Sequence, residues 1–156
     1  MLVSTKGRYG LRMMIDIARH QNAGRVSLRE IGERQGISSK YLEQLARLLC
    51  SGGMLAGSRG QGGGYVLAKD PGDIRVGDIL RSAEGTVAPV ACLAHTELEC
   101  PRAGVCETRG FWNGLGRVID EYVDSYTLAD LVAMQEREDV VPGPCMGYNT
   151  AGQAEA

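Results

Sequence analysis

The sequence lacks the features that mark membrane and secreted proteins. In a chain of 156 residues, no apolar run approaches the ~18 residues that a membrane-spanning helix requires. The opening stretch MLVSTKGRYGLRMMIDIA is interrupted by Lys6, Arg8 and Arg12, unlike a secretory leader or a membrane anchor. We therefore expect a cytoplasmic protein without a membrane partner, and structural disulfides are rare in that compartment.

The sequence also lacks the usual combinations of catalytic and cofactor-binding residues. It shows no paired general acid and base and no nucleophile triad. The glycine-rich stretch SRGQGGGYVLAKD lacks the Gly-Lys-Ser/Thr ending of a nucleotide-binding loop and does not open a helix. No two cysteines have the C-x2-4-C spacing typical of structural zinc sites. These absences predict a protein that is not an enzyme.

What the chain does have is an uneven distribution of charge. Residues 1–70 carry eleven basic and five acidic side chains, a net charge of +6, whereas residues 71–156 carry six basic and fourteen acidic side chains, a net charge of −8. The basic half can face a polyanion such as nucleic acid, and the acidic half cannot easily do so. An ordinary solvated surface is the alternative interpretation.

Two helices are predicted before Gly36. Apolar residues at helical spacing predict an amphipathic helix over 5–21. Ser27 and Glu30 have the spacing of a capping box, which starts a second helix. Gly36 is expected to end that helix in the left-handed conformation.

A third predicted helix follows this turn and stops at Ser51. Ser38 or Ser39 would cap it, and its inner face is predicted to hold Leu42, Leu45, Leu48 and Leu49. A short helix, a glycine turn and a second helix match the helix-turn-helix pattern. The outward side chains of the third helix suit base edges and phosphates, so we predict DNA contacts from Ser39, Lys40, Tyr41, Glu43, Gln44 and Arg47. An ordinary polar helix face is the alternative.

A β-hairpin and a short helix are predicted next. Met54–Ser58 and Tyr65–Ala68 would form the strands, and the tip would carry Arg59, suited to a narrow minor groove. Such a hairpin would be the wing of a winged helix-turn-helix. The helix after it would be capped by Asp73, with an inner face of Val76, Ile79, Leu80 and Ala83.

The stretch CLAHTELECPRAGVC contains three of the five cysteines, Cys92, Cys100 and Cys106, with seven and five residues between them. Thiolates are soft ligands that suit zinc, copper(I) and iron–sulfur clusters. These open spacings fit a loop around a larger object such as a cluster. The fourth ligand could be His95 or Glu107, an external ligand, or a group from a partner subunit. A disulfide within the loop would be an oxidised form without a cluster.

The stretch RGFWNGLGRVIDEYVDSY predicts a helix with two apolar stripes. One contains Phe111, Leu115, Val118 and Tyr122, and the other contains Trp112, Ile119, Val123 and Tyr126. One stripe can pack on the chain's own domain, and a twofold partner would cover the other. The predicted dimer interface is formed by Leu115, Val118, Ile119, Tyr122, Val123 and Tyr126, and packing within one chain is the alternative. Thr127 and Asp130 have the spacing of a cap for a last helix, LADLVAMQE.

The predicted fold is therefore mainly α with a small β-hairpin wing. Its parts are a winged helix-turn-helix domain at 1–84, a cysteine loop at 85–108, a dimerisation helix with a short final helix at 109–139, and a disordered tail at 140–156. Cys50, at the end of the third helix, is predicted to be a small buried residue, and Cys145 in the tail an incidental free thiol.

Taken together, these segments resemble the IscR-like iron–sulfur transcription regulators, which are dimeric winged helix-turn-helix proteins. The resemblance runs over about residues 1–136 and rests on STKGRYGLRMMIDIA, ERQGISSKYLEQL, SRGQGGGYVLAKD, the three-cysteine loop and YTLADLV. It implies DNA contacts at Ser39, Tyr41, Glu43, Gln44 and Arg59, and cluster ligation by Cys92, Cys100 and Cys106. It also implies a cytoplasmic homodimer on a pseudo-palindromic operator.

The resemblance further implies a cluster, 2Fe-2S in preference to 4Fe-4S, and a repressor of genes for iron–sulfur assembly, iron, or redox and nitrosative stress. The sequence departs from the family at the fourth ligand. Arg109 stands where the enteric assembly regulator has a histidine, and Arg8 stands where nitric-oxide-sensing relatives have an acidic residue. The alternative is a cluster-free regulator of the same fold, controlled by thiol oxidation, zinc or a protein partner.

Overall fold

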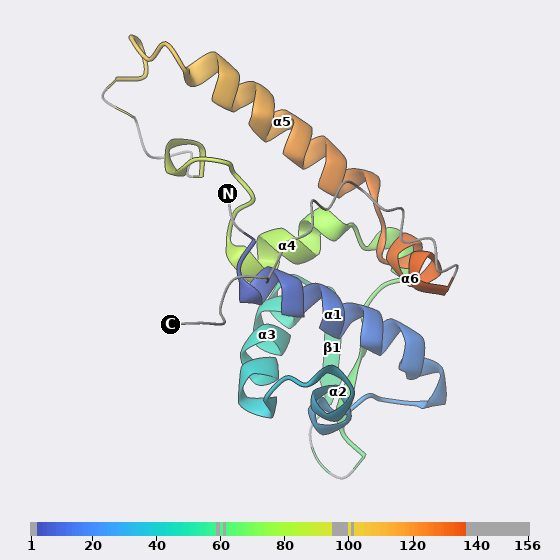
Figure 1. The fold of residues 1–156 in the computed structure, drawn as a ribbon. Coiled ribbons are helices and arrows are strands. Elements are labelled where there is room, and N and C mark those ends of the chain that lie inside the picture. The colour runs from blue at the N-terminus through green and yellow to red at the C-terminus, as the bar shows by residue number, and fades with distance from the viewer. Residues whose placement is uncertain (1–2, 59, 61, 95–99, 101, 137–156) are drawn as a thin grey trace, which may run out of the picture.

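The computed structural model describes residues 3–58, 60, 62–94, 100 and 102–136. Six α-helices and one antiparallel two-stranded hairpin make up the described part of the chain (Figure 1). None of the helices described here is long and apolar enough to cross a membrane. The mainly α architecture with a small β-hairpin matches the predicted fold class.

Helix α1 (Thr5–His20) runs across the middle of the molecule and supplies much of the core (Figure 1). Ser4 caps it by accepting a hydrogen bond from the Lys6 backbone at 3.1 Å. Met13, Met14 and Ile17 are completely buried, as their helical spacing predicts. The predicted helix over 5–21 is therefore confirmed to within one residue, and a 3₁₀ turn follows it.

Helices α2 (Leu28–Gln35) and α3 (Ser39–Ser51) form the predicted helix-turn-helix. Both halves of the Ser27 capping box are present, and Gly36 ends α2 in the left-handed region with a φ of 66°. Ser38 caps α3 by accepting a hydrogen bond from the Tyr41 backbone. The prediction for Leu48 is wrong: its side chain is 37% exposed, and Ala46 is buried instead. The buried face of α3 therefore consists of Leu42, Leu45, Ala46 and Leu49, and it does not include every leucine of the helix.

The wing consists of strands β1 (Leu55–Ser58) and β2 (Gly64–Leu67), paired antiparallel from Leu55–Leu67 to Ser58–Gly64. The hairpin is tied to the rest of the domain because Val26 and Tyr65 exchange backbone hydrogen bonds at 2.8 and 2.9 Å. A side chain at Gly64 would meet the Val26 carbonyl oxygen at 2.7 Å, so glycine is required for this close approach. The predicted hairpin is confirmed, with a first strand that begins one residue later and a second strand that lies one residue earlier than predicted.

Helix α4 (Val76–Glu84) follows a 3₁₀ turn over Pro71–Asp73. Its buried side is the predicted one, with Val76, Ile79, Leu80 and Ala83. The predicted capping role of Asp73 is wrong. The cap position of α4 is Arg75, and Asp70 instead caps the 3₁₀ turn with a hydrogen bond from the Gly72 backbone at 2.8 Å.

Helices α5 (Arg109–Ser125) and α6 (Leu128–Glu136) complete the described chain. Two cores hold these elements together. The larger core joins α1, α2, α3, the wing and the completely buried Leu128 of α6. The smaller core packs Ile119, Val123 and Tyr126 on Val76, Leu80 and Val87. The last turns of α5 are therefore fixed on α4, while its first turns project away from the rest of the molecule (Figure 1).

Candidate functional site

The outward face of α3 carries polar side chains that are free to meet another molecule. Ser39, Lys40, Glu43, Gln44 and Arg47 are all exposed, and Tyr41 is half-buried. The Arg47 Nε atom donates to the Glu43 carbonyl oxygen at 3.3 Å, so this arginine lies back along its own helix. The structure therefore places the predicted DNA-contacting residues of α3 together on one surface.

A buried carboxylate on α1 fixes the end of α2 and hence the turn before α3. Asp16 is 2% exposed, and Arg34 donates hydrogen bonds to both of its carboxylate oxygens. Nη2 donates to Oδ1 at 2.6 Å and Nε donates to Oδ2 at 3.1 Å. Gln35 Nε2 adds a hydrogen bond to Oδ2 at 2.9 Å. Burial alone would raise the pKa of Asp16, but the hydrogen bonds from Arg34 and Gln35 lower it below its ordinary value. The carboxylate therefore stays charged, as this pairing needs.

Sequence reasoning missed this network, although a signal for it was present. Asp16 stands among Met13, Met14 and Ile17 on the apolar side of α1. A charged residue on a buried helix face needs a partner, because an unpaired buried charge is very costly. Its position predicts that some basic side chain must reach it, but only the fold identifies Arg34.

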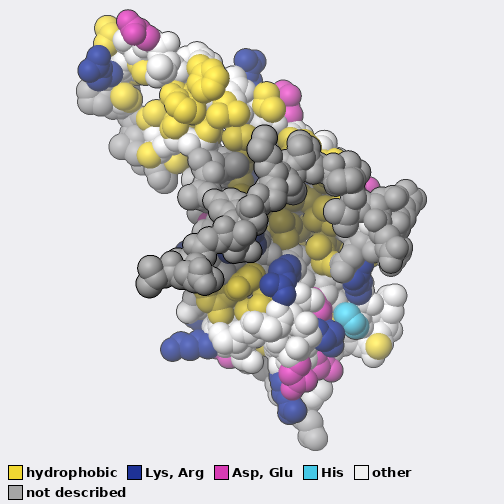
Figure 2. Space-filling view, in the orientation of Figure 1, with side chains coloured by type: hydrophobic (Ala, Val, Ile, Leu, Met, Phe, Trp, Pro, Cys, Tyr) yellow, Lys and Arg dark blue, Asp and Glu magenta, His cyan; other side chains and the backbone are white. Residues whose placement is uncertain are grey.

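Basic side chains are exposed along α1, α2 and α3 and in the segment that joins α1 to α2. The exposed basic residues of the amino-terminal half include Lys6, Arg8, Arg12, Arg25, Arg29, Lys40 and Arg47. Lys and Arg side chains are spread over the half that contains α1 to α3, and a few also lie beside the apolar surface along α5 (Figure 2). Arg59, predicted at the wing tip, lies outside the described residues.

The three loop cysteines are free thiols that lie between α4 and α5. Cys92 is exposed in a 3₁₀ turn over Ala91–Leu93, Cys100 is half-buried and Cys106 is exposed. Within the described part of the chain, no three or more His, Cys, Asp or Glu residues are close enough to hold a metal ion. His95 lies outside the described residues, and Glu107 is exposed beside Cys106.

Cys106 has surroundings that favour its thiolate. Its sulfur lies 3.6 Å from the Thr108 hydroxyl, and this hydrogen bond is the main reason that its pKa is lowered. Arg109 does not act as a ligand here: its Nη1 donates to the Ala103 carbonyl oxygen at 3.2 Å and closes the end of the loop. Cys50 differs, because burial raises the pKa of its thiol, as expected for a small core residue.

The side chains of the loop are therefore of the right chemical type to bind a metal or cluster through thiolates. The described part of the loop does not hold them in a preformed binding site. Three soft thiols are available, and one of them is biased toward the thiolate form that metals bind. The described residues do not converge on one point, so any such group would have to draw the loop around itself.

The two apolar stripes of α5 have different surroundings. Ile119, Val123 and Tyr126 pack on α4, so half of the predicted dimer-interface residues lie against their own chain. The other stripe is open: Phe111 is 65% exposed, Val118 61% and Tyr122 64%. Leu115, at 36%, completes this apolar face, which follows α5 along the upper part of the molecule (Figure 2). An exposed apolar face of this length indicates an interaction surface.

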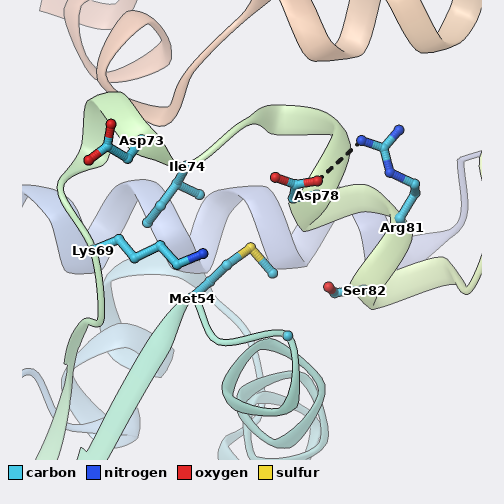
Figure 3. A pocket seen from close by; sticks show the side chains of 8 residues that line it. Met54, Lys69, Asp73, Ile74, Asp78, Arg81 and Ser82 are labelled. Atoms are coloured by element: carbon cyan, nitrogen blue, oxygen red, sulfur yellow. Dashed lines mark hydrogen bonds and ion pairs between the residues drawn. The ribbon is translucent and has the colours of Figure 1, made fainter.

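Two shallow cavities flank Arg81 but do not resemble active sites. One, of about 290 Å³, lies between the base of the wing and α4, with Met54, Lys69 and Asp78 around it (Figure 3). The other, of about 370 Å³, lies between Val87 and α5. Arg81 forms ion pairs with carboxylates. Its Nη2 atom lies 3.2 Å from Asp78 Oδ1 (Figure 3) and 2.5 Å from Asp124 Oδ1. Among the described residues that line them, neither cavity offers a histidine or a cysteine.

Comparison with known proteins identifies one family. The sequence pattern of the Rrf2 family, described as an iron-dependent transcriptional regulator, matches residues 3–134. The protein rrf2 of Nitratidesulfovibrio vulgaris is 42% identical over 132 residues, which cover 85% of this chain and 87% of that protein. The family is one of transcriptional regulators and not of enzymes, as the lack of catalytic combinations predicts.

Solved structures of two regulators have the same fold. IscR of T. potens is 40% identical, with a TM-score of 0.71, and the match covers 92% of this chain and 94% of that one. CymR of B. subtilis, titled the global cysteine regulator, is 38% identical, with a TM-score of 0.68, and the match covers 85% of this chain and 97% of that one. The predicted IscR-like resemblance and the winged helix-turn-helix fold are both confirmed.

Proposed function

Since this chain belongs to the Rrf2 family of transcriptional regulators, we propose that it is a homodimer that binds a pseudo-palindromic operator and senses its signal through a cluster on the loop thiols. The observation that carries DNA binding is the exposed polar face of α3, in a half of the chain with a net charge of +6. Salt-dependent contacts with phosphates would provide most of the affinity.

Sequence reading is assigned to α3 of each protomer in the major groove. The Gln44 amide can make a bidentate pair with adenine. The Glu43 carboxylate can accept from the amino group of cytosine and would reject a base pair that offers no donor. Arg59 would add shape readout in the minor groove. Twofold symmetry then places two half-sites about one duplex turn apart.

The open stripe of α5 supports the dimer. Phe111, Leu115, Val118 and Tyr122 follow one face of the helix and would pack against the same face of a second copy. The partner surface would be self-complementary, since a twofold axis presents the same patch twice. Such a dimer fixes the distance between the two copies of α3.

Cys92, Cys100 and Cys106 are the residues that would hold an iron–sulfur cluster. When bound, a cluster supplies a redox-active centre whose potential depends on its ligands and on solvent exposure. The chain's own residues would act by changing the conformation of the loop. Three thiolates bound to one cluster would order the segment that joins α4 to α5. Because α5 would carry the dimer contact, the order of this loop would set the spacing of the DNA-reading helices.

A second candidate is a regulator without a cluster, controlled by oxidation of the loop thiols, by zinc or by a protein partner. Two observations favour it. Cys92 and Cys106 are exposed, so an oxidant in solution can reach both thiols. The chain is also similar to CymR of B. subtilis, a structure described as that of the global cysteine regulator.

An absorption spectrum with iron and acid-labile sulfide counts, taken on protein purified without oxygen, tests the cluster. We expect visible absorbance with iron and sulfide in equal amounts, lost in Cys100→Ser and kept in the matched control Cys50→Ser. A colourless, iron-free protein that still responds to oxidants in a DNA-binding assay would establish the second candidate instead.

DNA binding is tested separately, by selection from a random duplex pool. We expect the unaltered chain to enrich a twofold-symmetric sequence and Glu43→Ala to accept more sequences with a similar overall affinity. Failure of the unaltered chain to enrich any sequence would refute the proposed role of α3.

A further inference from the structure

The ring of Tyr9, on α1, lies between two side chains. Its centroid is 5.8 Å from that of Tyr41, and the two ring planes meet at 84°, an edge-to-face pair. The Arg12 guanidinium lies over the Tyr9 ring, 5.3 Å from its centroid. Both distances fall within the range of favourable aromatic and cation–π contacts. One residue of α1 therefore contacts the first turn of α3.

The same arginine also reaches α2. Arg12 Nε donates to the Gln35 side-chain oxygen at 3.0 Å, and its Nη2 donates to the Gln35 carbonyl oxygen. Because Gln35 is the last residue of α2, this contact fixes the position of Arg12 relative to the turn. Tyr9, Arg12 and Gln35 thus connect α1 and α2 to the helix that is assigned to read DNA.

These contacts are not needed to start α3, and both tyrosines lie at the edge of the main core and not inside it. The backbone of Tyr41 is held by Ser38, with bonds to its carbonyl at 3.0 Å and its hydroxyl at 3.4 Å. Tyr9 and Tyr41 are only half-buried, and Arg12 is exposed. What the Tyr9 ring adds is a restriction on the direction of the Tyr41 side chain, since an edge-to-face pair favours one relative orientation.

We propose that Tyr9 is a positioning residue for DNA recognition: its ring holds the Tyr41 side chain in the orientation that meets the operator. The inference rests on the proposed function and adds to it that sequence selectivity depends on α1 as well as on α3. Residues at the start of a recognition helix are the ones that reach base edges, so the orientation of Tyr41 matters there.

The test compares Tyr9→Leu with Tyr9→Phe. Leucine keeps the helix and an apolar contact but removes the ring, whereas phenylalanine keeps the ring and removes only the hydroxyl. Affinity is measured for a duplex that the unaltered chain selects from a random pool, and for a random-sequence duplex of the same length. Thermal unfolding of each variant confirms that it is folded.

For Tyr9→Leu we expect affinity for the selected duplex to fall on the order of five-fold, the size expected of one aromatic pair, with random-duplex affinity unchanged. Tyr9→Phe should bind like the unaltered chain. Equal losses in both variants would overturn the inference, because they would indicate a direct contact by the hydroxyl. Unchanged binding by Tyr9→Leu would also overturn the inference. An equal loss of affinity of this variant for the selected and the random duplex would do the same.

A double variant separates positioning from general support of the fold. If Tyr9 acts through Tyr41, then Tyr9→Leu combined with Tyr41→Leu should bind no more weakly than Tyr41→Leu alone. Additive losses would show that Tyr9 acts by another route and would refute the proposal. An unaltered chain that selects no sequence would instead refute the proposed function, so the two failures can be told apart.

Discussion

Replacing the buried carboxylate of Asp16 should weaken the whole DNA-binding half. Asp16→Asn keeps the size of the side chain but removes its charge, and it turns one acceptor into a donor that faces Arg34 and Gln35. Two helices are affected at once, because Asp16 lies on α1 and its partners end α2. The helix-turn-helix therefore loses its main polar attachment to α1.

The expected cost follows from the exposure of the two partners. Removing one member of a buried ion pair typically costs about 3–5 kcal/mol, because the other charge is left without a partner. The Asp16 side chain is 1% exposed, but that of Arg34 is 34% exposed, so water can solvate the freed guanidinium. We therefore expect the lower end of the range, a loss of about 3 kcal/mol in the free energy of unfolding.

Urea unfolding at neutral pH measures this loss. The matched control is Arg29→Ala, which breaks the pair between Arg29 and Glu33, where both side chains are mostly exposed. Such surface pairs contribute about 0–1 kcal/mol, so the control should unfold almost like the unaltered chain. If Asp16→Asn is as mild as Arg29→Ala, the buried network does not hold α2 as described.

The pH dependence of the same measurement gives a second check. The pKa of Asp16 is lower in the folded chain than in the unfolded chain, where it is about 3.9. Its stabilising effect is therefore complete above about pH 4 and is lost as the pH falls through the lowered folded value. The difference between the unaltered chain and Asp16→Asn should shrink in that acid range, and a constant difference would exclude the carboxylate as its source.

Three further predictions concern the dimer, the loop and the start of α1. Val118→Asp should convert a dimer to a monomer in sedimentation, since it places a charge on the open stripe of α5. Arg117→Glu, on the exposed polar side of the same helix, should not. In chelator-treated protein, iodoacetamide should label Cys106 faster than Cys50, because the pKa of the Cys106 thiol is lowered and burial raises that of the Cys50 thiol. Mass spectrometry of samples taken over time shows which cysteine is labelled first. Glu84→Ala should destabilise the chain by about 1–3 kcal/mol, as the Glu84 carboxylate accepts three hydrogen bonds from the first turn of α1, and Glu84→Gln should recover part of the loss in urea unfolding.

Local signals in the sequence predicted most of the fold because they act over a few residues. The Ser27 capping box, the left-handed Gly36 and the Thr127–Asp130 cap each depend on residues within one turn of one another, and all three are present. Helix periodicity likewise distinguishes the two stripes of α5, because it depends only on the spacing of apolar residues along the chain. The sequence therefore predicted the elements that position α3.

Contacts between distant segments were not predictable in the same way. Leu48 continues the leucine pattern of α3 but is more than a third exposed, because the orientation of α3 is set by packing on α1 and α4. Asp73 is of a residue type that often caps helices, but the cap position of α4 in the folded chain is Arg75. For the loop cysteines, spacing indicates the kind of ligand they suit, whereas only a folded loop decides whether three sulfurs meet.

The contacts of α1 connect the end of α4, immediately before the thiol loop, to the helix-turn-helix. Glu84, immediately before the thiol loop, accepts hydrogen bonds from the Ser4 and Gly7 backbone at 2.8 Å each. A Cβ on Gly7 would meet the Glu84 Oε1 atom at 2.7 Å, so the lack of a side chain at Gly7 lets the Glu84 carboxylate reach the backbone of α1. About two turns further along, Asp16 of α1 holds the end of α2. A rearrangement of the loop that displaces Glu84 would therefore break its hydrogen bonds to the start of α1, the helix that supports the helix-turn-helix, in addition to the proposed effect through α5.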